Sequence, residues 1–237
     1  MESVVRGIVL HSLKYGDNGL IIKTLTPNGI FSFFIGSYIK NKKNKYPFLS
    51  YPLAIIDCTY YKTKKGKLPK IKSISLVYVP KISGYDFRRQ AISTFMAECA
   101  YKFIKEETFS TNIYSFLEDS IHFINETEYL HAAYPIQFGF KMAALLGFNI
   151  QNTDKEKTNK LFSIEKGFSL DSKADLDFND SCFLEDIISY DINQAIDIKI
   201  PSSSLKNIFN VLLRFLKYHF PEISALKSPE ILHNIIE

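Results

Sequence analysis

The sequence has little of what builds disulfides and metal sites. Three cysteines are present among 237 residues, at Cys58, Cys99 and Cys182, and they are odd in number and far apart. A disulfide framework needs paired cysteines, and a structural zinc site needs four cysteine or histidine ligands in short, paired spacings. We therefore expect three reduced thiols and no metal.

Long apolar runs are missing as well. No segment approaches the roughly 18 consecutive apolar residues of a membrane-spanning helix. The first residues, Met1-Glu2-Ser3, lead into alternating apolar and polar positions, which is unlike a secretory signal peptide. We expect a cytoplasmic protein that does not enter a membrane.

The chain also lacks the short motifs of common enzymes. It contains no GxxxxGKS or GxxxxGKT loop for nucleotide phosphates, no GxGxxG turn and no GxSxG nucleophile turn. None of its five histidines stands in an HExxH motif or beside a cysteine. We expect no catalytic residue and no cofactor, while an enzyme with a site assembled from scattered residues stays open as an alternative.

Charge is distributed unevenly along the chain. Residues 1–80 contain thirteen lysines and arginines but only three acids, which gives a net charge of +10, whereas the remainder sums to −6. A surplus of this kind favours a polyanionic partner for the first third of the chain. The alternative is that these lysines merely keep a small β domain in solution.

The first eighty residues have the pattern of a small barrel. Thr26-Pro27-Asn28-Gly29 is a tight-turn sequence, because proline presets φ and Asn-Gly tolerates positive φ. Five short segments are rich in β-branched and aromatic residues, at 4–11, 20–25, 30–35, 53–61 and 68–79. We predict a five-stranded OB-fold barrel over residues 1–80.

Beyond residue 80 the apolar period becomes helical. Apolar residues recur every three or four positions over 87–103, 113–124 and 136–147, and again after Pro201. Serines 202–204 are the expected caps of that last helix. The predicted class is α+β, with an all-α domain over residues 81–237 that contains a small β-hairpin insertion.

Two lysine clusters favour a nucleic acid as the partner. In an OB-fold, the loop after the third strand and the connection between the last two strands can border one groove that binds oligonucleotides. Lysine offers a mobile point charge for phosphate, and tyrosine can stack on a base. The residues that we predict to contact DNA are Arg6, Lys14, Lys40, Lys42, Lys43, Lys45, Lys62, Lys64, Lys65 and Lys67, with Tyr38 and Tyr46. An RNA-binding OB module and a non-catalytic scaffold protein stay open as alternatives.

The order of several short motifs resembles the bacterial recombination mediator family RecO. These motifs are Arg6–His11 with Tyr15-Gly16-Asp17, Thr26 with Gly29, Gly36 with Lys40, Phe138–Phe148, and Leu226-Lys227-Ser228. Each is short, but together they cover most of the chain. The resemblance implies a non-enzymatic DNA-binding protein of recombinational repair, associated with the nucleoid.

The resemblance also implies particular partners. Members bind single- and double-stranded DNA, anneal complementary strands, and help load the RecA recombinase onto strands coated by single-strand-binding protein. They work with RecR and, in some pathways, with RecF. Their helical domain docks the acidic, hydrophobic C-terminal tail of the single-strand-binding protein, for which the candidates here are Phe138, Phe140 and Lys141.

Many members of that family carry a four-cysteine zinc knuckle in the helical domain. The corresponding stretch here, about residues 149–182, contains one cysteine, Cys182. One thiol cannot supply the donor set of a structural zinc site. We therefore expect a hairpin around Lys166-Gly167 in place of the knuckle, and no zinc.

Overall fold

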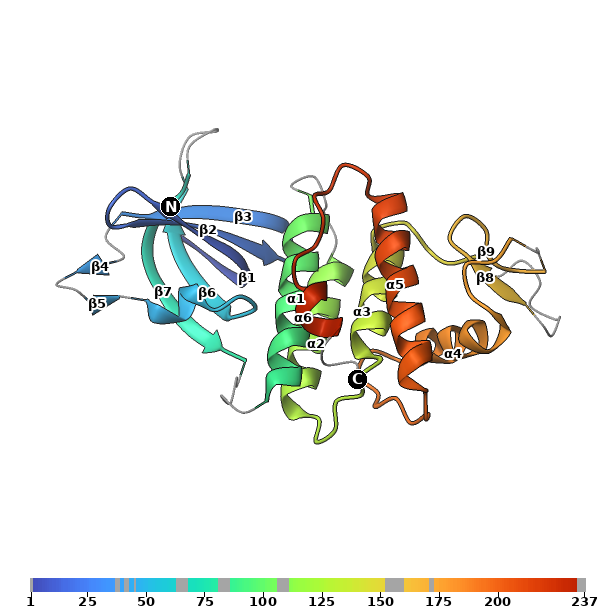
Figure 1. Cartoon of the computed structure of the whole chain (residues 1–237). Helices are drawn as coiled ribbons and strands as arrows, with labels where there is room; N and C mark the ends of the chain where they lie inside the picture. Colours follow the sequence, from blue (N-terminus) through green and yellow to red (C-terminus); the bar gives the residue numbers. More distant parts are fainter. Residues whose placement is uncertain are drawn as a thin grey trace. The chain divides into compact units, whose positions relative to one another are not determined.

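Two compact units make up the protein. The computed structural model describes residues 2–36, 39–40, 43–44, 46–62, 68–80, 86–105, 111–151, 160–170 and 173–233, with the backbone alone for residues 39, 40, 43, 44 and 233. The barrel unit contains residues 1–83 and 100–125, and the helical unit contains residues 84–99 and 126–237. The predicted α+β class, an OB-like barrel followed by helices with a small hairpin, is confirmed (Figure 1). The domain boundary at residue 80 stays a prediction.

Five strands in OB order form the barrel. They are β1 (Glu2–Tyr15), β2 (Gly19–Thr26), β3 (Gly29–Ile35), β6 (Ile55–Tyr61) and β7 (Lys70–Tyr78). Their spatial order is β1-β2-β3-β7-β6, and β6 pairs with β1 again. All neighbours are antiparallel except β3 and β7, which pair in parallel at Phe34 and Lys70. This is the Greek-key arrangement of an OB-fold, closed through a short β3–β7 contact.

Alternation along the strands fills the barrel interior. Every second side chain points inward and joins a cluster of Val9, Leu20, Ile22, Phe33, Ile35, Leu49, Ala54, Ile56, Cys58 and Ile74. Leu49 comes from the short 3₁₀ helix η1 (Pro47–Ser50), and the hydroxyl of Ser12 on β1 donates to its carbonyl. A small hairpin precedes η1; its strands, β4 (Ile39–Lys40) and β5 (Lys43–Asn44), have two residues each. Some outward positions of the same strands are exposed, such as Phe34 on β3 and Leu76 on β7.

Two strands begin later than we predicted. Leu53 has φ of 67°, a left-handed conformation that no regular strand contains, so β6 starts at Ile55. The amide of Leu53 instead donates to Val9 of β1 over 2.7 Å. Leu68 and Pro69 likewise precede β7, because proline has no N–H for a strand ladder.

The predicted turn at Thr26–Gly29 is confirmed, and a second glycine with positive φ ends a helix. Gly29 has φ of 104°, and the hydroxyl of Thr26 donates to its carbonyl over 2.8 Å, which closes the β2–β3 hairpin. Gly147 has φ of 100° directly after helix α3 (Tyr134–Leu145), and the amide of Phe148 donates back to Ala143. Positive φ is inexpensive for glycine alone.

Six helices are described, and four of them lie where the apolar stripes were predicted. Besides α3 they are α1 (Phe87–Phe103), α2 (Thr111–Glu126), α4 (Phe178–Ser189), α5 (Ser202–His219) and α6 (Pro229–His233). None of the helices in the described part of the chain is long and apolar enough to cross a membrane. The three cysteines are free thiols, of which Cys58 and Cys99 are buried.

Close helix packing forms the core of the helical unit (Figure 1). Helices α3 and α5 approach each other at Gly139, where a β-carbon would lie 2.7 Å from Cδ2 of Leu212. Phe95 of α1 and Phe209 of α5 meet edge to face, with ring centroids 5.8 Å apart. Glycine at 139 is therefore what allows Leu212 to fill the space between the two helices.

Helices α5 and α6 differ from what we predicted. The serines 202–204 lie inside α5, whose N-cap is Pro201 without any side-chain cap, so the prediction that they cap it is wrong. Helix α6 has only five residues, too few for a visible apolar stripe, and was not predicted. Its start is held by Glu98, whose carboxylate accepts from the backbone amides of Lys227 and Ser228 and from the Ser228 hydroxyl, over 2.7–3.0 Å.

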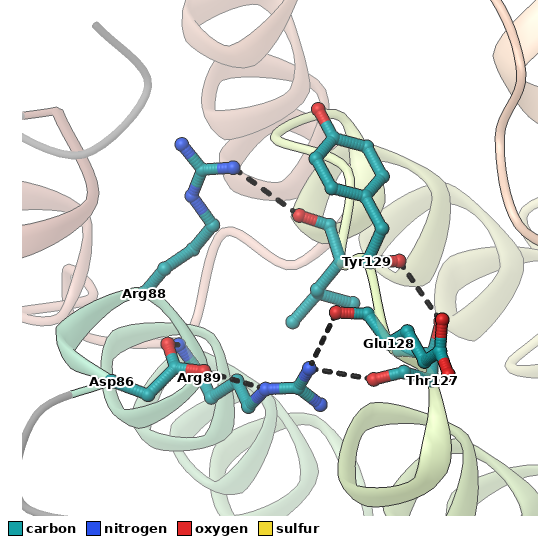
Figure 2. Close-up of polar contacts among 7 residues, drawn as sticks. Asp86, Arg88, Arg89, Thr127, Glu128 and Tyr129 are labelled. Carbon is teal, nitrogen blue, oxygen red and sulfur yellow. Dashed lines mark hydrogen bonds and ion pairs between the residues drawn. The ribbon is translucent and has the colours of Figure 1, made fainter.

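Two arginines at the start of α1 bind backbone carbonyls of residues 127–130, in the loop between α2 and α3 (Figure 2). Arg89 donates to Asp86 and to the carbonyl of Thr127, both over 2.6 Å. Arg88 donates to the carbonyl of Leu130 over 3.3 Å. These contacts hold the loop before α3 to α1 and occupy guanidinium groups that would otherwise be open to an anion.

A small hairpin lies where the zinc knuckle of the resembled family is expected. It consists of β8 (Leu161–Ser163) and β9 (Gly167–Ser169), and the central residue of each strand, Phe162 and Phe168, is buried. No group of three or more potential metal ligands occurs among the described residues. With Cys182 alone in this stretch, the donor set does not fit a structural zinc ion.

Candidate nucleic-acid interface

The outer face where β1 meets β6 is electrically balanced. Arg6 and Asp57 lie opposite each other in register and form a bidentate ion pair, 2.8 Å from Nε to Oδ1 and 3.0 Å from Nη2 to Oδ2. The guanidinium lowers the pKa of Asp57, and the carboxylate raises the pKa of Arg6. A predicted DNA contact at Arg6 would therefore have to exchange this carboxylate for a phosphate.

A second acid of the barrel is also neutralised. Oε1 of Glu2 accepts from the ammonium of Lys72 over 2.7 Å and from the hydroxyl of Tyr61 over 3.0 Å. These hydrogen bonds lower the pKa of Glu2 and raise that of Lys72. Both pairs are exposed, and exposed ion pairs add little to stability because solvent screens them. Their consequence is that two of the three acids in residues 1–80 are already paired.

Other cations of the barrel face solvent. Lys14, Lys62 and Lys70 are exposed, and no described acid forms an ion pair with them. The ammonium of Lys23 lies 5.3 Å from the ring centroid of Tyr101, which also stacks on His11 at 4.3 Å. Burial and the charge of Lys23 lower the pKa of His11, so this histidine does not add to the positive charge near pH 7.

A groove of about 710 Å³ opens on the outer surface of the barrel, next to the β1–β2 turn and the start of β7. Its lining includes Tyr15, Ile21, Phe34, Tyr46, Leu68 and Lys70. In OB-folds, the β2–β3 face and the loops that correspond to these two connections bind oligonucleotides. We refer to it below as the barrel groove.

Two exposed rings stand in the barrel groove. Tyr15 at the end of β1 is 60% exposed and Phe34 of β3 is 37% exposed, whereas the neighbouring Phe33 is fully buried. Their rings meet edge to face with centroids 5.7 Å apart. Lys70, the partner of Phe34 in the β3–β7 pairing, supplies a positive charge at the rim.

The structure describes the predicted contact residues to different extents. Tyr38, Lys42, Lys45, Lys64, Lys65 and Lys67 lie outside the described residues, and only the backbone is described at Lys40 and Lys43. Lys14 and Lys62 are exposed at strand ends, and Arg6 is paired. Tyr46 is half-buried, packs against the barrel core and lines the barrel groove. The DNA-contact residues as a set stay a prediction.

The sequence reasoning did not select Tyr15, Phe34 or Lys70 as contacts. Strand alternation carries a signal for them, because Phe33 is fully buried and its neighbour Phe34 must then point outward. Tyr15 and Lys70 come next to turn residues, where cations and aromatics are easily attributed to solubility or packing. Their meeting in one groove depends on the β3–β7 pairing, which no local pattern encodes.

The residues suggested for a partner tail lie in the helical unit. Phe138 and Phe140 of α3 are 0% and 3% exposed and belong to its core. Lys141 donates to the carbonyl of Tyr190, and burial lowers its pKa. These placements offer no open surface at the two rings, so the structure gives this tail site no support.

A different groove of the helical unit is open. It has a volume of about 850 Å³ and is lined by Ile164, Lys173, Asp175, Arg214, Lys217, Tyr218 and Pro221, among others. Arg214 forms an ion pair with Asp175 at 2.6 Å while its side chain stays 62% exposed, and Tyr218 is 55% exposed. This hollow, lined by three cations, two acids and some apolar side chains, is called the helical groove below.

The barrel and the helices that follow it define an OB-fold protein of two parts. Comparison with known families identifies the family to which this protein belongs. Residues 1–80 match the family described as recombination protein O N terminal, and residues 84–230 match recombination protein O C terminal. The chain therefore belongs to the recombination protein O family, RecO, a family of DNA repair proteins, and the resemblance inferred from its motifs is confirmed.

Two relatives match this chain along nearly their full length. The chain is 23% identical over 242 residues to the DNA repair protein RecO of Flavobacterium psychrophilum, which covers 99% of both proteins. It is 21% identical over 238 residues to that of Azobacteroides pseudotrichonymphae, with 98% of both covered. For Bacteroides fragilis the identity is 29% over 142 residues, or 60% of this chain and 59% of the relative.

Proposed function

We propose that this protein binds single- and double-stranded DNA through its barrel and anneals complementary strands in recombinational repair. In this role it helps to load the RecA recombinase onto DNA coated by single-strand-binding protein, and it performs no catalysis itself. It would act in the cytoplasm, on the chromosome. The observation that carries the proposal is the barrel groove, a cationic and aromatic hollow at the ligand-binding position of an OB-like barrel with a net charge of +10 over residues 1–80.

The mechanism follows from where the charge lies. Lysines around the barrel groove attract two phosphate backbones and lower their mutual repulsion. Contacts to phosphate leave the base edges free, so complementary strands can still pair. The process needs no nucleotide hydrolysis, because pairing itself is downhill once the backbones are close together.

Strand annealing across a salt series tests this proposal. Two complementary oligonucleotides, one with a fluorophore and one with a quencher, are mixed with and without the protein and with and without single-strand-binding protein. We expect faster annealing at about 0.05 M salt and a steep decline towards 0.2 M, because each phosphate contact releases counterions. An unchanged annealing rate and no DNA affinity at low salt would contradict the proposal and favour a scaffold.

Protein partners form the second part of the proposal. Family membership supports RecR and, in some pathways, RecF as partners. We place the acidic, hydrophobic tail of single-strand-binding protein in the helical groove. Lys173, Arg214 and Lys217 supply positive charge there beside the acids Glu165 and Asp175, and the exposed ring of Tyr218 offers apolar surface.

Replacement of Arg214 and Lys217 by glutamate tests the helical groove. We expect the affinity for a fluorescent tail peptide to fall about tenfold or more, because a loss of about 1.4 kcal/mol corresponds to a factor of ten. The matched control reverses the exposed Lys199 and Lys227, which lie outside this groove, and should leave the affinity unchanged. Equal binding by both double variants, measured by fluorescence anisotropy, would place the tail elsewhere.

A further inference from the structure

Tyr15 and Phe34 expose more surface than packing requires. The two rings are the large aromatic side chains of the barrel groove with the greatest exposure, at 60% and 37%. They meet edge to face at an interplanar angle of 81°, so the edge of one ring points at a face of the other. The exposed part of the pair, above all at Tyr15, is still open for a third flat ring to stack on.

Two glycines hold the Phe34 ring in place. A β-carbon at Gly19 would lie 2.7 Å from Cε2 of Phe34 and 2.6 Å from the carbonyl oxygen of Tyr15. On the other side, a β-carbon at Gly36 would lie 3.3 Å from Cε1 of the same ring. The ring therefore lies against the backbone of the β1–β2 turn, and its position is fixed before any ligand arrives. A preorganised ring costs little conformational entropy on binding.

The charges around the groove suit a polyanion that carries flat rings. Lys70 and Lys72 line the groove, and Lys14 precedes Tyr15 in the sequence. Glu2 is bound to Lys72, which leaves Asp17 in the β1–β2 turn as the described acid nearest in sequence to Tyr15. An apolar protein segment would gain nothing from these cations, whereas a nucleic acid strand would use rings and cations together.

We propose that Tyr15 and Phe34 form a stacking subsite for one unpaired nucleobase, which makes the barrel groove selective for single-stranded over duplex DNA. The proposal rests on the proposed DNA binding by the barrel and deepens it. Inside a duplex, both faces of each base are covered by neighbouring bases, so only an unpaired base can stack on the exposed surface of these rings. Stacking acts on any base, and the subsite is therefore insensitive to sequence.

The test separates phosphate contacts from base contacts. Dissociation constants are measured for a fifteen-nucleotide thymidine strand, an abasic strand of the same length and a fifteen-base-pair duplex. The variants are Tyr15→Ala, Phe34→Ala and Phe34→Leu, since leucine keeps apolar packing on Gly19 without a π-face. We expect each variant to lose about 5- to 100-fold in affinity for the thymidine strand, from about 1–3 kcal/mol per stacked base. Affinities for the abasic strand and the duplex should stay within about twofold.

Matched controls make the result decisive. Phe34→Tyr keeps the ring and should bind the thymidine strand like the wild type, and Val4→Ala removes an exposed apolar side chain of β1 that does not line the groove. Equal losses on all three ligands, or no loss on the thymidine strand, would overturn the subsite. If the wild-type protein binds none of the three ligands, the proposed DNA binding itself fails.

Discussion

Reversal of Lys42, Lys43, Lys64 and Lys65 to glutamate abolishes measurable DNA binding at about 0.1 M salt. These lysines belong to the two clusters of residues 1–80, one before η1 and one in the connection between β6 and β7. Each lost phosphate contact lowers the dependence of log affinity on log salt by about 0.7 for single strands. Four contacts therefore flatten the salt slope by about 3 and reduce the affinity more than 100-fold.

Fluorescence anisotropy with a labelled single strand, repeated at several salt concentrations, measures both effects. The thermal unfolding midpoint should remain close to that of the wild type, because these substitutions leave the apolar core of the barrel unchanged. A control variant reverses Lys155, Lys157, Lys199 and Lys227 and changes the net charge by the same amount. Comparable losses in both variants would mean that net charge, rather than the barrel clusters, determines affinity.

Gly139→Ala and Leu212→Ala each destabilise the protein, and the double variant is more stable than the sum of their effects predicts. Leu212 is fully buried, and its truncation should cost about 2–5 kcal/mol in the free energy of unfolding. A methyl group at position 139 would stand 2.7 Å from Cδ2 of Leu212, and such overpacking costs about 1–3 kcal/mol. Once Leu212 is truncated, the methyl group occupies part of the space that it leaves.

Urea unfolding of the four proteins in this cycle gives the coupling energy. We expect at least about 1 kcal/mol in favour of the double variant, as for residues in direct contact. A second cycle pairs Gly139→Ala with Ile22→Val in the barrel core, where the effects should add within about 0.5 kcal/mol. Additivity in the first cycle would mean that α3 moves away from α5 at little cost.

The regular elements of this fold could be predicted because their periods differ. Alternation located β1, β2 and β3, and the spacing of Phe87, Ala91, Phe95 and Cys99 located α1. What escaped prediction depends on tertiary contacts. Leu53 adopts a positive φ because its amide bonds to Val9, far away in sequence, and α6 exists through Ser228 and its contact with Glu98.

The candidate site was predictable in kind but only partly in its residues. Composition alone indicated a cationic barrel, and the lysine clusters marked two of its connections. The groove itself depends on strand order, since Phe34 and Lys70 become neighbours only when β7 inserts beside β3. Arg6 shows the opposite case, because its cross-strand partner Asp57 offsets a charge that the sequence offered to DNA.

Strand β1 pairs with two different strands of the barrel. Its first half pairs with β6 and its second half with β2, and Ile8 lies opposite both Ile55 and Leu25. A chain emerging from the ribosome can form the β1–β2–β3 meander early, yet half of its first strand stays without a partner until residues 55–61 have been made. The first residues of the chain therefore gain their strand partner only after residues 55–61 have been made.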